Sequence, residues 1–244
     1  MSNTIRKERK KTIVIVAALV AVMAIGGISA YFTSADDAVN TWTYGKVKID
    51  LQEPNYDKEN PSDRVNTTPN QEVAKDPKIQ NTGKNDAYVF IKVTVPKKDV
   101  IVANQDGTRQ DSKLQELVDY QWNTNWVVVE EDTTAADYNT YVMAYAKDGA
   151  CLPLAPQVTT SVLFKNAVAE HIENAGAEGI ITIKNIIEGQ GLENMTLTIN
   201  VEAYAIQTTD LGKDNVNSPA AVWTILSNQT NNTTVGDLTD YFNS

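Results

Sequence analysis

The sequence predicts an all-β protein, an antiparallel jelly-roll-like β-sandwich with a few short helices. Several segments alternate apolar and polar residues with a period of two, which is typical of strands that bury one face. Turn signals that contain glycine separate these segments. Strand-like and helix-like patterns do not alternate in the regular way that a parallel sheet requires, so an antiparallel sandwich is favoured.

Two segments carry the strongest strand patterns. Residues 88–95 place valine and isoleucine at every odd position, with Tyr88 and Phe90 on the opposite face. Residues 196–206 form the longest alternating segment: the odd positions are apolar, and the even positions up to Glu202 are polar. Further strands are expected at 46–51, 126–130, 141–145, 160–164 and 180–184. Turns are expected at Asn81-Thr82-Gly83, Asp106-Gly107, Asp148-Gly149 and Gly189-Gln190-Gly191.

Three short helices are expected among the strands. Residues 112–118 begin with the form of a capping box. Apolar residues at helical spacing run from 164 to 172, and Gly176 follows as a stop signal. Ser218 before Pro219 resembles an N-cap, and an apolar stripe follows over residues 222–226. The polar segments 55–70 and 228–244 are expected to form a loop and a loose tail.

The composition excludes several classes of function. One cysteine cannot form a disulfide framework or a multi-cysteine metal site, and one histidine cannot supply a two-histidine zinc motif. The formal net charge is −10, and residues 31–244 carry 16 basic and 30 acidic residues, a charge of −14. Nucleic acid is therefore not an expected partner, because phosphate contacts require clustered lysine and arginine.

The first thirty residues have the pattern of an export signal. Basic residues between 6 and 11 precede an uncharged run over 12–30 that ends in small residues. We expect cleavage after Ala30, so that the mature chain starts at Tyr31 and residues 31–244 form a single domain. The run is close to the roughly 20 residues that span a bilayer, so an uncleaved anchor is the competing interpretation. With cleavage, the chain contacts the membrane only before the signal is removed.

The candidate reactive residues favour structural roles. We expect His171 to be a solvent-facing helix residue and Cys151 a small apolar residue without a nearby positive charge. The pair Gly189 and Gly191 lacks the third glycine of a dinucleotide-binding loop. The acidic groups at 36–37, 130–132 and 210–214 do not have the spacing of a calcium loop and favour a solvated surface, with calcium binding left open. No catalytic, metal-binding or cofactor-binding residue is predicted.

Two longer stretches of the sequence indicate more about the protein than its composition does. They are Ala30–Leu51 and Pro69–Val95, the second with Lys75-Asp76-Pro77, Asn81-Thr82-Gly83 and Asp86-Ala87-Tyr88-Val89. Both resemble the TasA/camelysin family of exported biofilm-matrix proteins, and residues 152–164 and 201–207 resemble the closing strands of that family. The sequence departs from the family at Gln157, where the family often has glycine after proline, which puts the local turn in doubt.

The resemblance implies a function as well as a fold. It implies a Gram-positive origin, export through a SipW-type signal peptidase, and a secreted subunit that polymerises into fibres of the extracellular matrix. Such fibres are understood as donor-strand assemblies, in which the mature N-terminal segment of one subunit completes the sheet of the next. An accessory anchoring or matrix protein is a further possible partner. Some family members are called metallopeptidases, but this sequence has no two-histidine zinc motif to support that activity.

The segment 31–44 fits the donor role. It carries large apolar residues between small polar ones, namely Tyr31, Phe32, Val39, Trp42 and Tyr44. An incomplete sheet exposes backbone groups that such an extended segment can pair with. The alternative is that the segment folds back as an edge strand of its own domain. A monomeric or membrane-anchored adhesion module and, with less support, a secreted metallopeptidase are the competing functions.

We predict no peptidase activity, because a single histidine cannot complete the zinc site that zinc peptidases use. The measurement is casein hydrolysis by purified residues 31–244 with zinc supplied. Hydrolysis that is lost both on chelation and in the His171→Ala variant would contradict this prediction.

Overall fold

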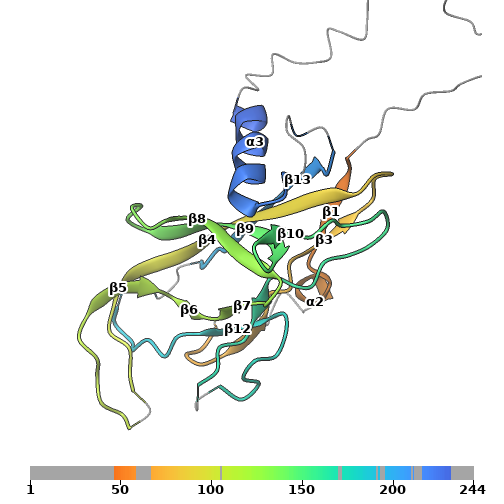
Figure 1. Ribbon diagram of the computed structural model, residues 1–244. Helices are drawn as coiled ribbons and strands as arrows, with labels where there is room; N and C mark the ends of the chain where they lie inside the picture. Colours follow the sequence, from red (N-terminus) through yellow and green to blue (C-terminus); the bar gives the residue numbers. More distant parts are fainter. Residues whose placement is uncertain are drawn as a thin grey trace, which may run out of the picture. The chain divides into compact units, whose positions relative to one another are not determined.

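The computed structural model describes residues 47–58, 67–104, 106–169, 172–190, 192, 196–209, 211 and 216–231. These residues form two layers of antiparallel strands, with one helix against the outside of the larger sheet (Figure 1). The larger sheet contains β4 (Ala87–Val100), β5 (Lys113–Glu116), β8 (Trp126–Asp132), β9 (Tyr138–Lys147), β10 (Ala150–Cys151) and β13 (Asn200–Gln207).

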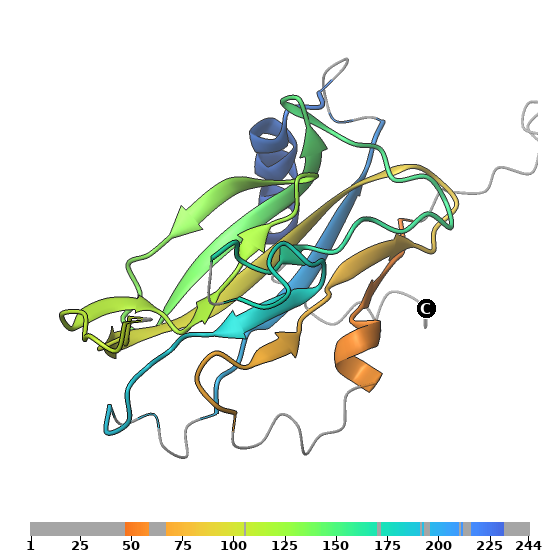
Figure 2. The same ribbon diagram turned by 90° about the horizontal axis from the view of Figure 1, so that it is seen from below.

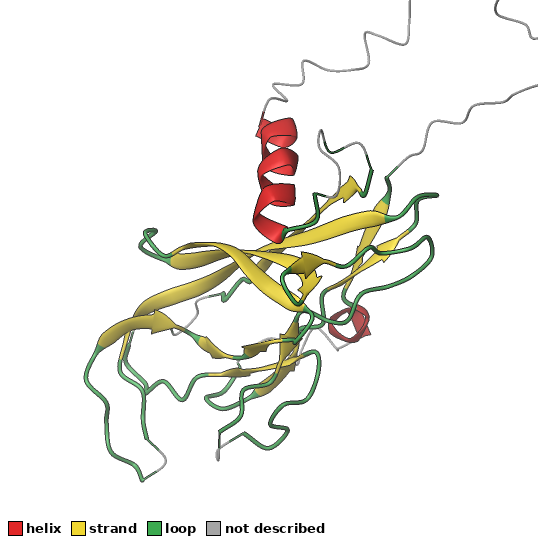
Figure 3. Ribbon diagram, in the orientation of Figure 1, coloured by secondary structure: helices red, strands yellow, loops and turns green. Residues whose placement is uncertain are grey.

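The second layer consists of three smaller sheets (Figure 2). They are β2–β12–β6, β1–β3 and β11–β7. The strands are β1 (Ile49–Gln52), β2 (Glu72–Ala74), β3 (Lys78–Asn81), β6 (Val118–Asp119), β7 (Gln121–Trp122), β11 (Phe164–Lys165) and β12 (Ile180–Ile183). In the described part of the chain the helices are α2 (Pro54–Lys58) and α3 (Pro219–Asn231) (Figure 3). The predicted class, an all-β antiparallel sandwich-like fold with a few short helices, is confirmed.

The two faces of β4 build the two main cores, as the alternation predicts. The odd residues Val89, Ile91, Val93 and Val95 are fully buried between the layers with Met143 and Phe164. The even residues Tyr88 and Phe90 belong to a second core on the outside of the larger sheet. One strand therefore supplies side chains to both cores, because successive residues point to opposite faces.

Helix α3 covers part of the outer face of the larger sheet, and its prediction from Ser218-Pro219 is confirmed. Val222, Trp223 and Leu226 are buried in the second core. The Trp223 ring lies 5.4 Å from that of Phe90, centroid to centroid. The apolar stripe therefore holds the helix on the sheet, and the burial of these large side chains supplies most of its stability.

Two predicted helices are wrong. Residues 112–118 form β5 and the start of β6, and β5 pairs with Lys97–Val100 of β4. Leu114 is 49% exposed whereas Leu117 and Val118 are buried, so the three do not share the buried face that a helix would give them. A capping box is a signal from four residues, and here the pairing with β4 outweighs it.

The segment 164–172 is also not helical. Phe164 starts the two-residue strand β11 and is fully buried, whereas Val168 is 67% exposed, so the expected helical stripe does not exist. The preceding segment 160–163, predicted as a strand, is irregular up to β11. The loop that follows is held by the Glu72 carboxylate, which accepts hydrogen bonds from Asn166 Nδ2 (3.0 Å) and Asn174 N (2.9 Å). Burial raises the pKa of Glu72, but these hydrogen bonds outweigh it and leave the pKa below its usual value.

The remaining sequence predictions agree with the structure in most places. The strands expected at 46–51, 126–130, 141–145 and 180–184 are found as β1, β8, β9 and β12. The expected turn at Asp148-Gly149 closes the β9–β10 hairpin with φ values of 52° and 82°. Gln157, where the turn was in doubt, takes a left-handed φ of 66° and donates its N–H to Asn81 O at 2.7 Å. The segments expected as a loop from residue 55 and as a loose tail from residue 228 instead start within α2 and α3. The strand expected over 196–206 is found as β13 and starts only at Asn200.

We predict unequal costs for the same substitution at two paired valines. Val93 and Val201 are opposite each other on β4 and β13 and face the same core, but only Val93 is fully buried. Val93→Ala should lower the free energy of unfolding by about 2 kcal/mol and Val201→Ala by about 1 kcal/mol or less. Urea unfolding of the two variants measures the difference. Equal losses would show that the margin at β13 is as well packed as the centre of the sheet.

Candidate functional site

The most distinctive feature of the larger sheet is the open edge of β13. This strand pairs with β4 over its whole length, from Asn200 opposite Thr94 to Gln207 opposite Ala87. Among the described residues, no strand pairs with its other edge. An unpaired edge presents a row of backbone donors and acceptors that an added strand can satisfy.

The register shows which residues of β13 face that edge. The Lys97 N–H of β4 donates to Asp137 O on the β9 side, while Pro96 O accepts from the Leu117 N–H on the opposite side. Even-numbered residues of β4 therefore direct their backbone groups toward β13, because these groups alternate sides along an antiparallel strand. Their partners in β13 are even-numbered as well. The odd-numbered residues Val201, Ala203 and Ala205 consequently direct N–H and C=O to the open edge.

The same odd-numbered residues form an incompletely covered apolar margin. Ile199, Val201, Ala203 and Ala205 pack against the inner core but stay only partly buried. The β4 residues opposite them are fully buried because β4 has neighbours on both sides. The margin therefore has apolar surface that a further strand would remove from water.

The opposite border of the sheet, β8, is much less suited to strand addition. It pairs with β9, and its register shifts between Val128 and Glu130, which marks a β-bulge. Glu130, Glu131 and Asp132 follow at exposed positions. Bulges and charges are the devices by which edge strands avoid unwanted pairing. Strand β13 has no register shift over its eight residues, so it is the better acceptor.

The predicted donor segment lies outside the described residues. The expected cleavage site, Ala30 and Tyr31, is not described. The same holds for the residues of the expected intersubunit strand, Tyr31, Phe32, Val39, Trp42 and Tyr44. Val47 is the first described residue, two residues before the start of β1, and β1 approaches β13. In the sequence, the segment 31–44 precedes β1 by only a few residues.

The motif Lys75-Asp76-Pro77 fixes the chain that follows β1. The buried Asp76 carboxylate accepts hydrogen bonds from the backbone N–H of Asn55 (3.0 Å) and Tyr56 (3.2 Å) at the start of α2. Lys75 Nζ lies 2.9 Å from Glu53 Oε1, and its ammonium stands over the Tyr56 ring at 5.2 Å. This motif therefore anchors α2, and with it the end of β1, on the second layer.

The Asn81-Thr82-Gly83 motif has an equivalent role at the other end of β1. Asn81 is fully buried, and its side-chain amide donates to Leu154 O (2.7 Å) and Asn85 O (2.8 Å). The Thr82 N–H donates to Lys48 O at 2.9 Å. These two motifs thus hold β1 in place next to β13.

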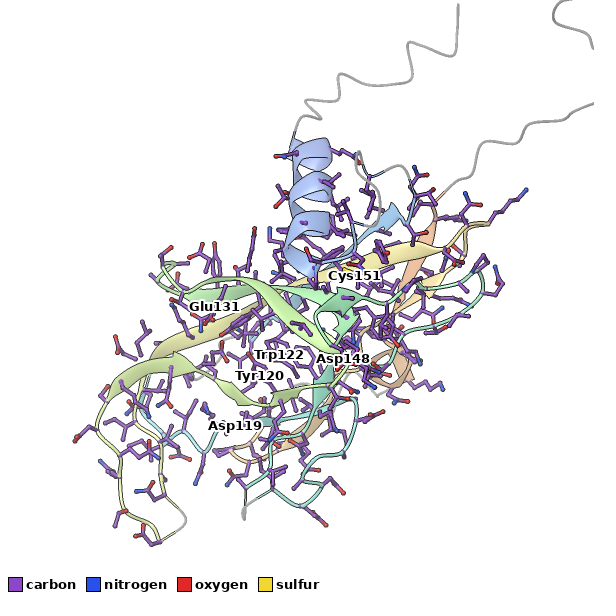
Figure 4. The ribbon with its side chains drawn as sticks, viewed as in Figure 1. Asp119, Tyr120, Trp122, Glu131, Asp148 and Cys151 are labelled. Atoms are coloured by element: carbon purple, nitrogen blue, oxygen red, sulfur yellow. The ribbon has the colours of Figure 1, made fainter. Side chains whose placement is uncertain are left out.

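Of the reactive residues considered from the sequence, Cys151 and Gly189 lie among the described residues. Cys151 is buried under α3 in the second core, and burial raises the pKa of its thiol to about 12 (Figure 4). It is a small apolar residue of the core, as predicted. His171 and Gly191 lie outside the described residues, whereas Gly189 is in a turn with φ of 78°. The described residues contain no group of three or more His, Cys, Asp or Glu side chains that could hold a metal ion.

A half-buried polar cluster was not predicted from the sequence. The Glu116 carboxylate accepts hydrogen bonds from Tyr141 Oη (2.7 Å) and Asn139 Nδ2 (2.8 Å). Burial and then the hydrogen bond to Glu116 raise the pKa of Tyr141 to about 12. Tyr120 and Trp122 lie next to this cluster between the layers, whereas Asp119, at the end of β6, is on the other side of the same chain segment (Figure 4). The cluster closes this end of the sandwich, and no sequence spacing indicates it because its members come from different strands.

Over the same described ranges, the structure contains no helix of the length and apolarity needed to cross a bilayer, and the apolar run 12–30 lies outside these ranges. In comparisons with known proteins, no family model, no curated protein and no solved structure matches the chain.

We predict that Cys151 resists labelling in the folded protein. Its thiolate fraction is negligible at pH 8 because the folded pKa is about 12, and the side chain is 4% exposed. A chromogenic disulfide reagent at pH 8 should label the native chain at least about a hundredfold more slowly than the urea-unfolded chain. Fast native labelling would contradict the assignment of Cys151 to the core.

The raised pKa of Cys151 also affects stability. The thiol favours the folded state at pH below about 8.5, and that contribution disappears as pH rises toward 12.

Proposed function

We propose that the protein is a secreted structural subunit that polymerises into extracellular matrix fibres. In this proposal the segment 31–44 of one copy pairs with the open edge of β13 in the next copy. The observation that carries the proposal is the β13 edge, which is regular over eight residues and has no partner among the described residues. A sheet in this state gains both hydrogen bonds and apolar burial from an added strand.

The size and composition of the segment support this pairing. Fourteen extended residues span roughly 46 Å, more than the roughly 26 Å of an eight-residue strand such as β13. The segment carries large aromatic residues, whereas the margin it would cover contains the small Ala203 and Ala205. In an added strand, the large side chains of the segment would lie beside the small Ala203 and Ala205 and fill the margin without steric conflict.

Export and release complete the proposal. We propose that a SipW-type signal peptidase cleaves after Ala30, which places the product outside a Gram-positive cell and frees the segment only there. The resemblance to the TasA/camelysin family supports this order of events, and an accessory anchoring or matrix protein fits the same scheme. Mass spectrometry of the mature N-terminus tests it, since a start at Tyr31 is expected and an intact Met1 would indicate a membrane anchor.

We predict that Ala203→Pro abolishes fibres while the subunit still folds. Proline removes one backbone donor, and at position 203 this donor faces the open edge and not β4. The matched control Ala203→Ser keeps the N–H and should polymerise normally. Circular dichroism establishes the fold of both variants, and electron microscopy at high protein concentration detects fibres. Normal fibres from folded Ala203→Pro would contradict pairing at this edge.

Removal of residues 31–40 tests the donor side of the same pairing. The truncated chain should stay a folded monomer without fibres, because its acceptor edge is intact but its donor segment is not. A peptide of residues 31–44 should bind this monomer and slow polymerisation of the intact mature chain. If the segment instead folds back on its own β13, polymerisation of the intact chain should not respond to the peptide, and the intermolecular proposal would be abandoned.

A further inference from the structure

The outer face of the larger sheet is divided into two parts with different chemistry. Helix α3 covers the part around Tyr88 and Phe90 (Figure 1). The same face of β4 continues through Lys92, Thr94 and Pro96, since side chains alternate with a period of two. A hollow of about 690 Å³ lies over this second part, with a lining that includes Lys92, Thr94, Pro96, Tyr138, Thr140 and Asn200.

The polar side chains of this face stand in rows across three strands. Asn200 of β13 is opposite Thr94 of β4, and Thr94 is opposite Thr140 of β9. In the next row Pro96 is opposite Tyr138, whose side chain is 46% exposed. Neighbouring strands are about 4.8 Å apart, so each row offers evenly spaced groups to a ligand that lies across the sheet.

These polar groups are available to a ligand. In the described part of the chain, the side chains of Thr94, Thr140, Thr198 and Asn200 make no hydrogen bond to another residue. Some exposed polar residues elsewhere pair with a neighbour instead, for example Thr134 Oγ1, which donates to Asp132 Oδ1 at 2.7 Å. Hydroxyl and amide groups both donate and accept hydrogen bonds, which suits a ligand that carries many hydroxyl groups.

The charges around the hollow do not favour an anion. Lys97 Nζ donates to Thr133 O at 2.6 Å, so its ammonium is already engaged. Lys92 is opposite Glu202 on β13, and Asp137 stands at the rim of the hollow. Lys98 also lines the hollow and has an interaction partner. Of the three lysines, Lys97 and Lys98 therefore have partners and Lys92 is opposite a carboxylate, so an anionic ligand would gain little.

We infer that this face binds a neutral carbohydrate chain. The threonine and asparagine rows supply hydrogen bonds to sugar hydroxyls, and the exposed Tyr138 ring with Pro96 supplies an apolar surface for the C–H face of a sugar ring. The hollow is within the usual size of a ligand site. The site is separate from the outward backbone of β13 and does not depend on the proposed fibre assembly.

The experiment is isothermal titration calorimetry of the full mature chain with maltohexaose, cellohexaose and mannohexaose, and with hexagalacturonate as an anionic chain. We expect at least one neutral hexasaccharide to bind more tightly than hexagalacturonate. Tyr138→Ala should weaken that binding about tenfold, and Tyr138→Phe should keep it because the ring remains. Asn200→Ala should weaken it several-fold through the loss of hydrogen bonds.

The matched control is Val158→Ala, an exposed apolar residue (47%) of the second layer, which should bind as the unchanged chain does. All variants should melt at the same temperature and form the same fibres in electron microscopy, so a failure of the carbohydrate proposal is distinct from a failure of fibre assembly. Absence of binding to all three neutral chains would overturn the inference. Preferential binding of hexagalacturonate, or full affinity in folded Tyr138→Ala, would also overturn it.

Discussion

The fold depends on the pairing of β4 with neighbours on both sides. This strand of 14 residues pairs with β9 along one edge and with β13 and β5 along the other. Its odd side chains fill the core between the layers, and its first even side chains support α3. Because both cores share this strand, disruption of its ladder would expose apolar surface on both faces at once.

The sequence predicts those features that are local in the chain. The two faces of β4 follow from simple alternation, and α3 follows from a cap, a proline and an apolar stripe that are adjacent in sequence. The capping box at 112–115 fails because its outcome depends on β4, a partner elsewhere in the chain. The open edge of β13 likewise cannot be predicted from its own residues, because it depends on which other strands pair with β13, and among the described residues only β4 does.

The motifs Lys75-Asp76-Pro77 and Asn81-Thr82-Gly83 act on one element, β1. Asp76 and Lys75 fix the chain after β1, and Asn81 with Thr82 fixes the turn beside its start. Their polar groups are buried and paired, which makes them costly to replace one at a time. A short strand such as β1 needs this support because its four residue pairs alone give little stability.

The bulge in β8 and the acids after it have a consequence for the architecture of an assembly. Under the proposed function each subunit has one acceptor edge and one donor segment, which a polymer chemist would call a functionality of two. Such units give unbranched chains, whereas a second receptive edge would raise the functionality and produce a network. Under the same proposal, the bulge at Val128–Glu130 would keep this border of the sheet out of growth, and the product would be a thread and not a gel.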